Sequence, residues 1–260
     1  MRTRKVVSAS LQRNCRRYVL QDPIGNVLVL GDLYSPLYRI SDVYCALEGH
    51  KVAGVCSVYH GFSTPNVVFS SGTLETKQAL LKKALSCVSN DFISLCHPGN
   101  VGLFERCSTV LHVHHEHQMV ADPFGKIRSD NVGVVRVSRP ELESLSRFYE
   151  EHHAEAWTPI QFEAGPYYCV KHEGKIVSAA GVHAVTPKIA QLGNIVTDEA
   201  YRNLGFATAC TSAVAANLAS KGRIISLFVR TDNAPAIHMY QNLGFSKKHE
   251  IAFLVMRKNA

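Results

Sequence analysis

Apolar residues in the second half of the chain follow two different spacings, and each spacing predicts one kind of element. Residues 189–196 form a mostly apolar run of strand length. A helix is predicted next, because apolar residues recur at helical spacing. They are Phe206, Cys210, Ala213, Val214 and Leu218. Gly222 ends this helix, and residues 224–229 are typical of a buried strand. The pattern therefore predicts a strand–helix–strand unit.

The loop between this strand and this helix has the features of an anion site. The first N–H groups of a helix lack partners within the helix and lie at the positive end of its dipole, an arrangement that binds phosphate. In the segment Arg202–Ala207, Gly205 lets an anion approach the backbone, and the small Ala207 leaves the approach clear. Arg202 adds a guanidinium that matches phosphate oxygens. We therefore predict phosphate binding at this loop.

Two more helices have recognisable starts. Ser138 and Glu141 form a capping box, which predicts a helix that ends near Glu151. Asn233 is a preferred N-cap residue, and the proline two positions later is tolerated in a first helical turn. The inward stripe of that second helix comprises Ala236, Ile237, Tyr240 and Leu243. Gly244 ends it.

The first half of the chain repeats the pattern of the second. Residues 44–55 resemble residues 168–179, and each segment predicts a strand, a Glu-Gly turn and a strand. In the first half, a strand at 66–70, a helix at 74–88 and a strand at 92–95 follow. The predicted buried face of that helix comprises Leu80, Leu81, Ala84, Leu85 and Val88. We infer two copies of one α/β unit.

The two copies differ at the anion-binding loop. In the first half only Ser71-Gly72-Thr73 joins the strand to the helix, without an arginine or a second small residue at the right spacing. We therefore expect the N-terminal copy to have lost the anion site. It would cover the substrate cleft or stiffen the pair of domains.

Composition narrows the class of protein. The chain has 260 residues, enough for one large or two small domains. No apolar run reaches the roughly eighteen residues of a membrane span. The eight cysteines include no C-x-x-C pair and mostly lie in apolar runs. This favours reduced, buried thiols and a cytoplasmic protein.

The net charge of +7 is concentrated at the N-terminus. The basic residues that precede the first acidic residue, Asp22, are Arg2, Arg4, Lys5, Arg13, Arg16 and Arg17. The rest of the chain is nearly balanced in charge, so a nucleic-acid-binding stripe is not indicated there.

The basic N-terminal segment predicts an amphipathic helix. Its inward residues would be Val7, Leu11, Cys15 and Tyr18. Asp22-Pro23 then supplies a natural stop. An organelle transit peptide is the alternative, because the first twenty residues are rich in arginine and lack acids.

A histidine-rich run, from His112 to His117, invites comparison with metal sites. Side chains alternate between the two faces of a strand, so His112 and His114 point away from the side of His115 and His117. Zinc takes three or four ligands from the protein, and neither face gathers that many. We therefore expect a solvated or half-buried strand and no metal site.

Residues from about 134 to 260 resemble the GNAT superfamily of acyl-CoA-dependent N-acyltransferases. The segment Arg202–Ala207 matches the pyrophosphate signature of that superfamily: Gln or Arg, two residues, Gly, one residue, then Gly or Ala. The segment Asn233–Phe245 matches a second motif, in the right order. The resemblance implies a layered α/β (α+β) fold, with tandem GNAT-like mixed sheets flanked by helices and the C-terminal copy intact. We expect a degenerate GNAT-like domain at 1–130 and an N-acetyltransferase domain at 134–260.

The resemblance also implies that acetyl-CoA binds to the C-terminal domain as a cosubstrate. Backbone groups of Ile195, Val196 and Thr197 would pair with the pantetheine, and an amide of this strand would polarise the thioester carbonyl. The remaining residues that the resemblance assigns to the cofactor are Arg202, Asn203, Leu204, Gly205, Phe206, Ala207, Thr208, Asn233 and Tyr240.

Tyr240 stands at the superfamily's usual proton-donor position. A phenol with a pKa of about 10 is protonated at neutral pH and can protonate a thiolate. The alternative is a packed core aromatic. The general base is not defined, because this chain has Gln191 where related two-domain proteins often carry Glu. His183 and Glu163 are the candidates, and deprotonation of the amine through a water is the third alternative.

The sequence thus predicts an acetyl-CoA-dependent N-acetyltransferase. A primary amine, on a small molecule, an amino acid or a peptide, would attack the thioester directly, since no nucleophile is placed to form a covalent intermediate. Two alternatives stay open: a longer-chain or amino-acid N-acyltransferase of the same fold, and a non-catalytic CoA-binding protein, which Gln191 favours. We expect no nucleic-acid or membrane partner, and a homodimer is compatible with the sequence.

Overall fold

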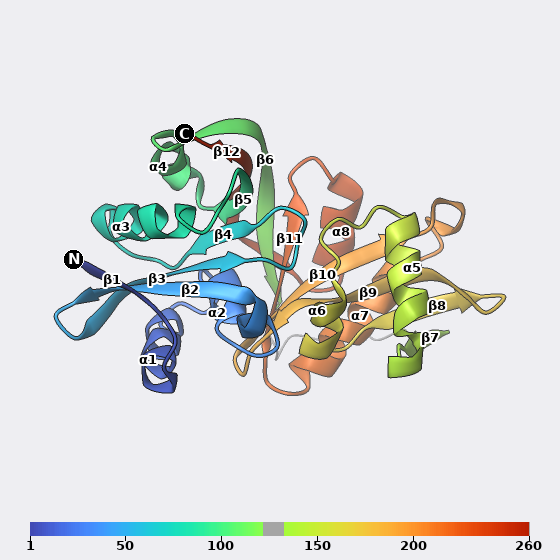
Figure 1. Cartoon of the computed structure of the whole chain (residues 1–260). Helices are drawn as coiled ribbons and strands as arrows, with labels where there is room; N and C mark the ends of the chain where they lie inside the picture. The colour runs from blue at the N-terminus through green and yellow to red at the C-terminus, as the bar shows by residue number, and fades with distance from the viewer. Residues whose placement is uncertain (122–132, 260) are drawn as a thin grey trace. The chain divides into compact units, whose positions relative to one another are not determined.

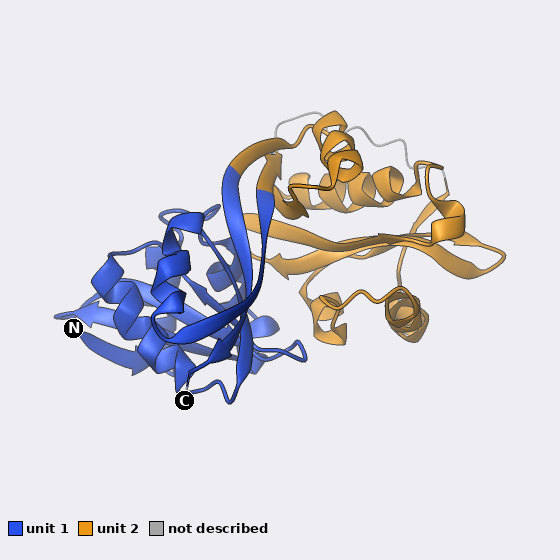
Figure 2. Cartoon of the chain, turned by 90° about the horizontal axis from the view of Figure 1, so that it is seen from above, with its two compact units in different colours: residues 1–117, 249–260 blue, residues 118–248 orange. Residues whose placement is uncertain are grey.

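The computed structural model describes residues 1–121 and 133–259, which form two compact units. Unit 1 comprises residues 1–117 and 249–260, and unit 2 comprises residues 118–248 (Figure 2). Each unit combines β-strands with helices (Figure 1), so the predicted mixed α/β class is confirmed.

Unit 1 is built on a mixed sheet with the strand order β1-β2-β3-β4-β5-β12-β6. Strands β4 and β5 are parallel, whereas β1–β2, β2–β3, β3–β4 and β5–β12 are antiparallel pairs. The elements are β1 Arg2–Lys5, α1 Ala9–Val19, α2 Val27–Asp32, η1 Leu37–Ile40, β2 Ser41–Glu48, β3 Lys51–Tyr59, β4 Asn66–Phe69, α3 Leu74–Leu85, β5 Asp91–Cys96, η2 Pro98–Asn100, α4 Val101–Glu105, β6 Ser108–Ala121 and β12 Ser246–Lys258.

Unit 2 has the order β6-β11-β10-β9-β8-β7, and helices cover both faces of its sheet (Figure 2). Strands β10 and β11 are parallel, whereas β7–β8, β8–β9 and β9–β10 are antiparallel. The elements are β7 Val134–Arg136, η3 Arg139–Glu141, α5 Leu142–Glu151, α6 Pro159–Ala164, β8 Tyr168–His172, β9 Lys175–Val185, β10 Ile189–Thr197, η4 Glu199–Tyr201, α7 Phe206–Ala219, β11 Ile224–Arg230 and α8 Ala234–Asn242.

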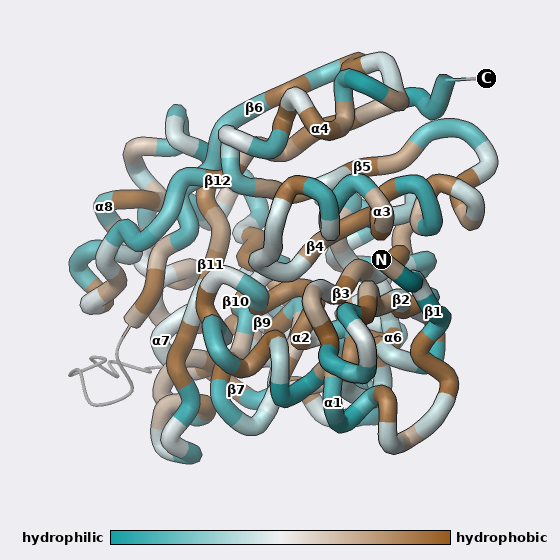
Figure 3. The backbone as a smooth tube through the Cα atoms, turned by 90° about the vertical axis from the view of Figure 1, so that its left-hand side faces the viewer, coloured by the Kyte–Doolittle hydropathy of each residue, from teal (hydrophilic) through white to brown (hydrophobic). Residues whose placement is uncertain are grey.

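Each unit has its own hydrophobic core. In unit 1 the apolar side chains of α3 pack with those of the strands, among them Leu81 and Phe92. In unit 2 the core includes Leu145 of α5, Leu192 of β10 and Val214 of α7. Hydrophobic stretches of the chain accordingly coincide with strands such as β9 and β11 (Figure 3). The predicted stripe of α7 is largely buried, as its periodicity requires.

The repeated pattern found in the sequence corresponds to two β-hairpins. In unit 1, β2 and β3 join at a turn where Glu48 pairs with Lys51. In unit 2, β8 and β9 join at a turn where His172 pairs with Lys175. The glycine of each turn has a positive φ, 58° in one and 79° in the other. In both units a strand and a helix follow the hairpin, as predicted.

The last strand, β12, returns to unit 1. Its residues 252–257 pair with β5, from Ala252 opposite Cys96 to Arg257 opposite Asp91. The Arg257 guanidinium also bonds both carboxylate oxygens of Asp91, at 2.8 and 3.0 Å. Residues 249–260 thus belong to the compact unit that contains the N-terminus. The predicted domain 134–260 therefore extends beyond unit 2, and the predicted break between 130 and 134 lies largely outside the described residues.

The N-terminal helix is present but shorter than predicted. Ser8 caps α1 by accepting a hydrogen bond from the Leu11 N–H at 3.2 Å, and Cys15 is fully buried. The inward placement of Val7 is wrong, because this residue precedes the N-cap and is 77% exposed. None of the described helices is long and apolar enough to span a membrane.

Candidate active site

Strands β10 and β11 part in the middle of unit 2. Their register pairs Ile189 with Ile224, Ala190 with Ile225 and Gln191 with Ser226, and no later pair follows among the described residues. Beyond Gln191, β10 continues to Thr197 beside β9 alone. The edge of β10 that faces β11 therefore carries backbone groups available to an extended ligand, by the same hydrogen bonding that adds a strand to a sheet.

A bulge interrupts β10 in the stretch beyond Gln191, on the side that pairs with β9. The register with β9 shifts between Gly193 and Val196, and Asn194 lies in the left-handed region with a φ of 53°. A bulge aims backbone groups away from the regular ladder, and such bulges are common beside active sites. Of three residues predicted to bind the cofactor, Ile195 lies within the bulge and Val196 and Thr197 follow it; all three are partly exposed.

The predicted anion loop leads into the N-terminus of α7. Gly205 is the N-cap residue, with a φ of 79° and no side-chain cap, and a Cβ added there would meet no atom within 4 Å. The first N–H groups of α7 therefore donate to no capping side chain. Arg202 is 58% exposed and pairs with Glu199 at 3.1 Å. A bare helix N-terminus beside an exposed guanidinium fits a pyrophosphate.

Tyr240 lies on α8 and is only 6% exposed. Asn233 caps this helix, because its Oδ1 accepts a hydrogen bond from the Ala236 N–H at 3.1 Å. The Tyr240 ring packs edge-on against Phe245, with 5.9 Å between ring centroids. Burial raises the pKa of Tyr240, so the phenol keeps its proton at neutral pH. Both the proton-donor role and the packing role of Tyr240 are compatible with this placement.

The family of unit 2 follows from comparison with known proteins. Residues 138–245 match the model of the Acetyltransferase (GNAT) family. Residues 138–245, in the C-terminal half of the chain, form a GNAT acetyltransferase domain. The match includes the bulged strand β10, the anion loop and α8, so the resemblance stated from the sequence is confirmed for this half.

Solved structures extend the likeness of fold to the whole chain. A protein assigned to the GNAT family from Novosphingobium aromaticivorans shares 20% identity at a TM-score of 0.65, over 93% of this chain and 99% of its own. A Drosophila protein has a TM-score of 0.74 at 11% identity, over 99% and 98% of the two chains. A tandem GNAT protein of clavulanic acid biosynthesis has a TM-score of 0.61 at 13% identity, over 100% and 99%. A search of curated proteins gave no match.

Gln191 is the last residue of β10 that pairs with β11 in unit 2. Its side chain is fully buried, and neither its Nε2 nor its Oε1 has a hydrogen-bond partner among the described residues. Its strand neighbour Ser226 accepts a hydrogen bond from the Gln118 Nε2 at 3.2 Å. Unlike a carboxylate, the Gln191 amide cannot accept a proton at neutral pH, so this position supplies no general base.

Of the two candidate bases, His183 contacts helix α6 and Glu163 lies on it. The Nδ1 of His183 is 3.1 Å from the Nε2 of Gln161, and burial lowers the pKa of His183 to about 4. His183 is therefore neutral at pH 7. Glu163 follows Gln161 by two residues on α6 and is exposed.

A polar network next to β10 was not predicted from the sequence. Gln161, Tyr149, Tyr167 and Asn194 are all buried and are joined by hydrogen bonds to one another or to the backbone. One local signal was available: Thr158 and Gln161 form a capping box at the start of α6. The contacts with Asn194 join distant segments and leave no local pattern in the sequence.

The matching loop of unit 1 is closed. The Thr73 side chain caps α3 by accepting a hydrogen bond from the Thr76 N–H at 3.2 Å. The Ser71 N–H donates to the Asn26 Oδ1 at 2.8 Å, and the Tyr18 hydroxyl lies 2.7 Å from the Ala53 carbonyl oxygen and 3.0 Å from that of Ser71. The Ser71 and Thr76 N–H groups are thus occupied within the unit.

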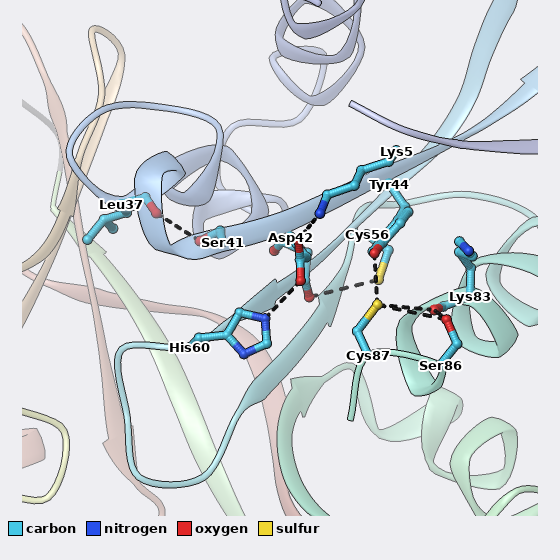
Figure 4. Close-up of polar contacts among 11 residues, drawn as sticks. Lys5, Leu37, Ser41, Asp42, Tyr44, Cys56, His60, Lys83, Ser86 and Cys87 are labelled. Atoms are coloured by element: carbon cyan, nitrogen blue, oxygen red, sulfur yellow. Dashed lines mark hydrogen bonds and ion pairs between the residues drawn. The ribbon is translucent and has the colours of Figure 1, made fainter. Parts of the chain in front are cut away.

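Other polar groups of unit 1 are also paired internally. Figure 4 shows Lys5 and His60 directed at Asp42, and the His60 Nε2 lies 3.1 Å from the Asp42 carboxylate. These two partners outweigh desolvation and lower the pKa of Asp42. Nearby, the Tyr44 hydroxyl lies 2.8 Å from the Cys87 thiol.

The histidine-rich run lies on β6, as predicted. His114 pairs with Glu116 at 3.0 Å and stacks on Phe253, and His115 lies 3.4 Å from Glu250. These contacts engage the rings within unit 1. Among the described residues, no group of three or more His, Cys, Asp or Glu side chains is arranged to hold a metal ion.

Proposed function

We propose that unit 2 binds acetyl-CoA and transfers its acetyl group to a primary amine. The observation that carries the proposal is the bare, glycine-capped N-terminus of α7, which follows the unpaired edge of β10. In this arrangement Ile195, Val196 and Thr197 pair with the pantetheine. The N–H groups at the start of α7 hold the pyrophosphate.

The remaining cofactor assignments follow from the same loop. Arg202 exchanges its exposed partner Glu199 for a phosphate, at little cost because exposed ion pairs contribute little to stability. Asn203, whose φ is 63°, and Leu204, which is 60% exposed, shape the loop. Phe206, Ala207 and Thr208 supply the first turn of α7. Asn233 keeps its capping role in α8.

The reaction we propose is direct attack of the neutral amine on the thioester carbonyl carbon. A C–N bond forms, the C–S bond breaks, and the amine nitrogen loses one proton to solvent. Tyr240 protonates the departing thiolate. Backbone N–H groups at the β10 bulge stabilise the negative charge that develops on the carbonyl oxygen. The acceptor is a small-molecule or peptide amine, and we place the protein in the cytoplasm.

Release of free thiol from acetyl-CoA in the presence of a panel of primary amines tests the proposal. We expect turnover with at least one amine, and Tyr240→Phe should lower the turnover number by ~10²–10⁴ while leaving acetyl-CoA affinity nearly unchanged. Tyr168→Phe, a tyrosine on β8, is the matched control and should retain full activity. Full activity of Tyr240→Phe would assign Tyr240 to packing alone.

The buried Gln191 amide has no hydrogen-bond partner among the described residues and cannot act as a general base. It therefore favours a second candidate function, a CoA-binding protein without catalysis. That protein would bind acetyl-CoA in calorimetric titration but release no thiol with any amine. Turnover with a longer acyl-CoA and none with acetyl-CoA would instead indicate an N-acyltransferase of different acyl specificity.

A further inference from the structure

The hydrogen bonds around α6 and β10 fix which atoms of each side chain donate and which accept. Gln161 lies at the centre. Its Oε1 accepts from the Thr158 backbone N–H at 3.2 Å and from the Asn194 Nδ2 at 2.8 Å. Its Nε2 lies 3.1 Å from the Ala156 carbonyl oxygen and 3.1 Å from the Nδ1 of His183.

Backbone groups determine the orientation of this amide. The Thr158 N–H can only donate, and the Ala156 carbonyl can only accept. A flipped Gln161 amide would place its NH₂ against the Thr158 N–H and its oxygen against the Ala156 oxygen. The orientation with Oε1 toward Thr158 is therefore the one that satisfies both backbone groups.

The same reasoning orients Asn194. The Tyr167 hydroxyl donates its proton to the Val182 carbonyl at 2.6 Å, so its oxygen is left to accept. The Asn194 Nδ2 lies 3.1 Å from that oxygen and 2.8 Å from the Gln161 Oε1. Both neighbours accept, so the NH₂ end of Asn194 must face them. The backbone carbonyl of Asn194 accepts from the Tyr149 hydroxyl at 2.7 Å, whereas the side-chain Oδ1 has no partner among the described residues.

The chain of donors ends at His183. Because the Gln161 Nε2 donates, the Nδ1 of His183 must accept, and the proton of the neutral ring resides on Nε2. A Cβ added at Gly193 would lie 1.9 Å from this Nε2 and 2.0 Å from the adjacent Cδ2. The Nε2–H edge thus lies over the glycine that precedes the bulge residue Asn194. No described residue accepts from this N–H.

We propose that His183 serves the active site as a neutral Nε2–H hydrogen-bond donor, fixed in that tautomer by Gln161, and not as the general base. Gln161 is the positioning residue, because it sets the His183 tautomer and also holds the bulge residue Asn194. A ring with its proton on Nε2 and its Nδ1 engaged cannot accept the amine proton. It can donate to an oxygen of a ligand at the bulge.

The ionisation of His183 agrees with this role. Burial lowers its pKa to about 4, and the groups around it bring no charge into contact with the ring. Tyr149 of α5 and Tyr167 are neutral phenols whose hydroxyls are already engaged. Glu163 is the titratable residue of α6, and it is exposed. The donor therefore persists throughout the neutral pH range.

Imidazole ¹⁵N NMR on the unliganded protein tests the tautomer directly. We expect one protonated and one unprotonated ring nitrogen for His183, with Nε2 protonated, and no titration between pH 5.5 and 8. Protonation on Nδ1, or a titration near pH 6.5, would overturn the proposal. Assignment follows from the loss of the signal in His183→Gln.

The variant Gln161→Glu should reverse the direction of the hydrogen bond between residue 161 and His183. A carboxylate still accepts from Thr158 and Asn194, but it loses the hydrogen bond to the Ala156 carbonyl and toward His183 it can only accept, so the ring proton should move to Nδ1. The nearby negative charge should also raise the pKa of His183. We expect the NMR signature to switch tautomer and to titrate in the neutral range. Gln78→Glu, an exposed change on α3, is the matched control and should leave His183 unchanged. An unchanged His183 tautomer in a folded Gln161→Glu protein would contradict the proposal that Gln161 sets this tautomer.

Kinetic measurements distinguish His183 as a hydrogen-bond donor from His183 as a general base. The part of the proposal that concerns catalysis rests on the proposed acetyl transfer. His183→Gln retains an N–H near the Nε2 position and should keep turnover within about tenfold, whereas loss of a general base costs ~10²–10⁴. His183→Ala should raise the KM of the amine more than it lowers the turnover number. A loss of 10²-fold or more in His183→Gln would favour the base. If no amine turns over but the NMR result holds, the proposed function fails while the assignment of the tautomer stands.

Discussion

Gly205 is the residue on which the cofactor proposal depends most. Its φ of 79° strains any branched side chain, and a Cβ there points into the space at the start of α7. We expect Gly205→Val to weaken acetyl-CoA binding by at least ~10-fold, equivalent to ~1.4 kcal/mol. Calorimetric titration of the purified variant measures this.

A matched control lies at the other end of the same helix. Gly222 has a φ of 71° and equally open surroundings, so Gly222→Val carries a similar strain of ~1–2 kcal/mol without touching the proposed anion site. Both variants should lower the melting temperature to a similar extent, and only Gly205→Val should lose affinity. Equal affinities in the two folded variants would place the pyrophosphate elsewhere.

Asp32 in unit 1 makes stability depend on pH. Burial raises the pKa of this carboxyl to about 7, although the Ser57 hydroxyl donates to it at 2.6 Å. An unfolded aspartate has a pKa of about 3.9, so the folded state binds more protons between pH 4 and 7. The free energy of unfolding that Asp32 contributes is therefore present below pH 4 and is lost as the pH rises through 7.

Asp32→Asn removes this titration. We expect its free energy of unfolding, from urea denaturation, to exceed that of the wild type at pH 8, with the difference shrinking toward pH 5. Asp42→Asn is an informative comparison: the pKa of Asp42 is lowered, so its carboxyl stays ionised from pH 5 to 8 and its titration should add no change in stability across that range. A constant difference between Asp32→Asn and wild type across this range would mean that Asp32 does not titrate there.

At the scale of elements, the strand β10 shows what local patterns predict and what they miss. Apolar periodicity located β10, α7 and α8, and the glycine loop between the first two predicted the anion site. The bulge at Asn194 had no such signature. It is held by side chains such as Gln161, which lies 33 residues earlier in the chain, and sequence spacing does not report contacts between distant segments.

The orphaned amide of Gln191 is the second feature of β10 that depends on tertiary packing. A buried amide without partners costs ~1–3 kcal/mol, and replacement by an apolar group of similar shape removes that cost. We therefore expect Gln191→Met to raise the free energy of unfolding by ~1–3 kcal/mol. Urea denaturation of the unliganded protein measures the change. A marked loss of stability would show that a bound water satisfies the amide.

At the scale of the whole molecule, the sequence revealed the repeat but not the path of the last strand. The two hairpins share a recognisable pattern of strand, Glu-Gly turn and strand, because each copy buries its strands in the same way. The return of β12 to unit 1 rests on pairs such as Arg257 with Asp91, 166 residues apart. Such a pairing leaves no periodic signal, so the sequence predicted a contiguous C-terminal domain.

The asymmetry between the two copies sets the number of cofactor sites. In unit 2 the N-terminus of α7 has no side-chain cap, whereas in unit 1 Thr73 caps α3 and Asn26 occupies the Ser71 N–H. Because the N-terminus of α7 is uncapped and that of α3 is capped, we expect each chain to bind one acetyl-CoA. Calorimetric titration should therefore give a stoichiometry of one, and Gly205→Val should weaken that event without uncovering another. A second event of similar affinity, or one whose affinity Gly205→Val leaves unchanged, would mean that unit 1 opens its capped loop to the cofactor.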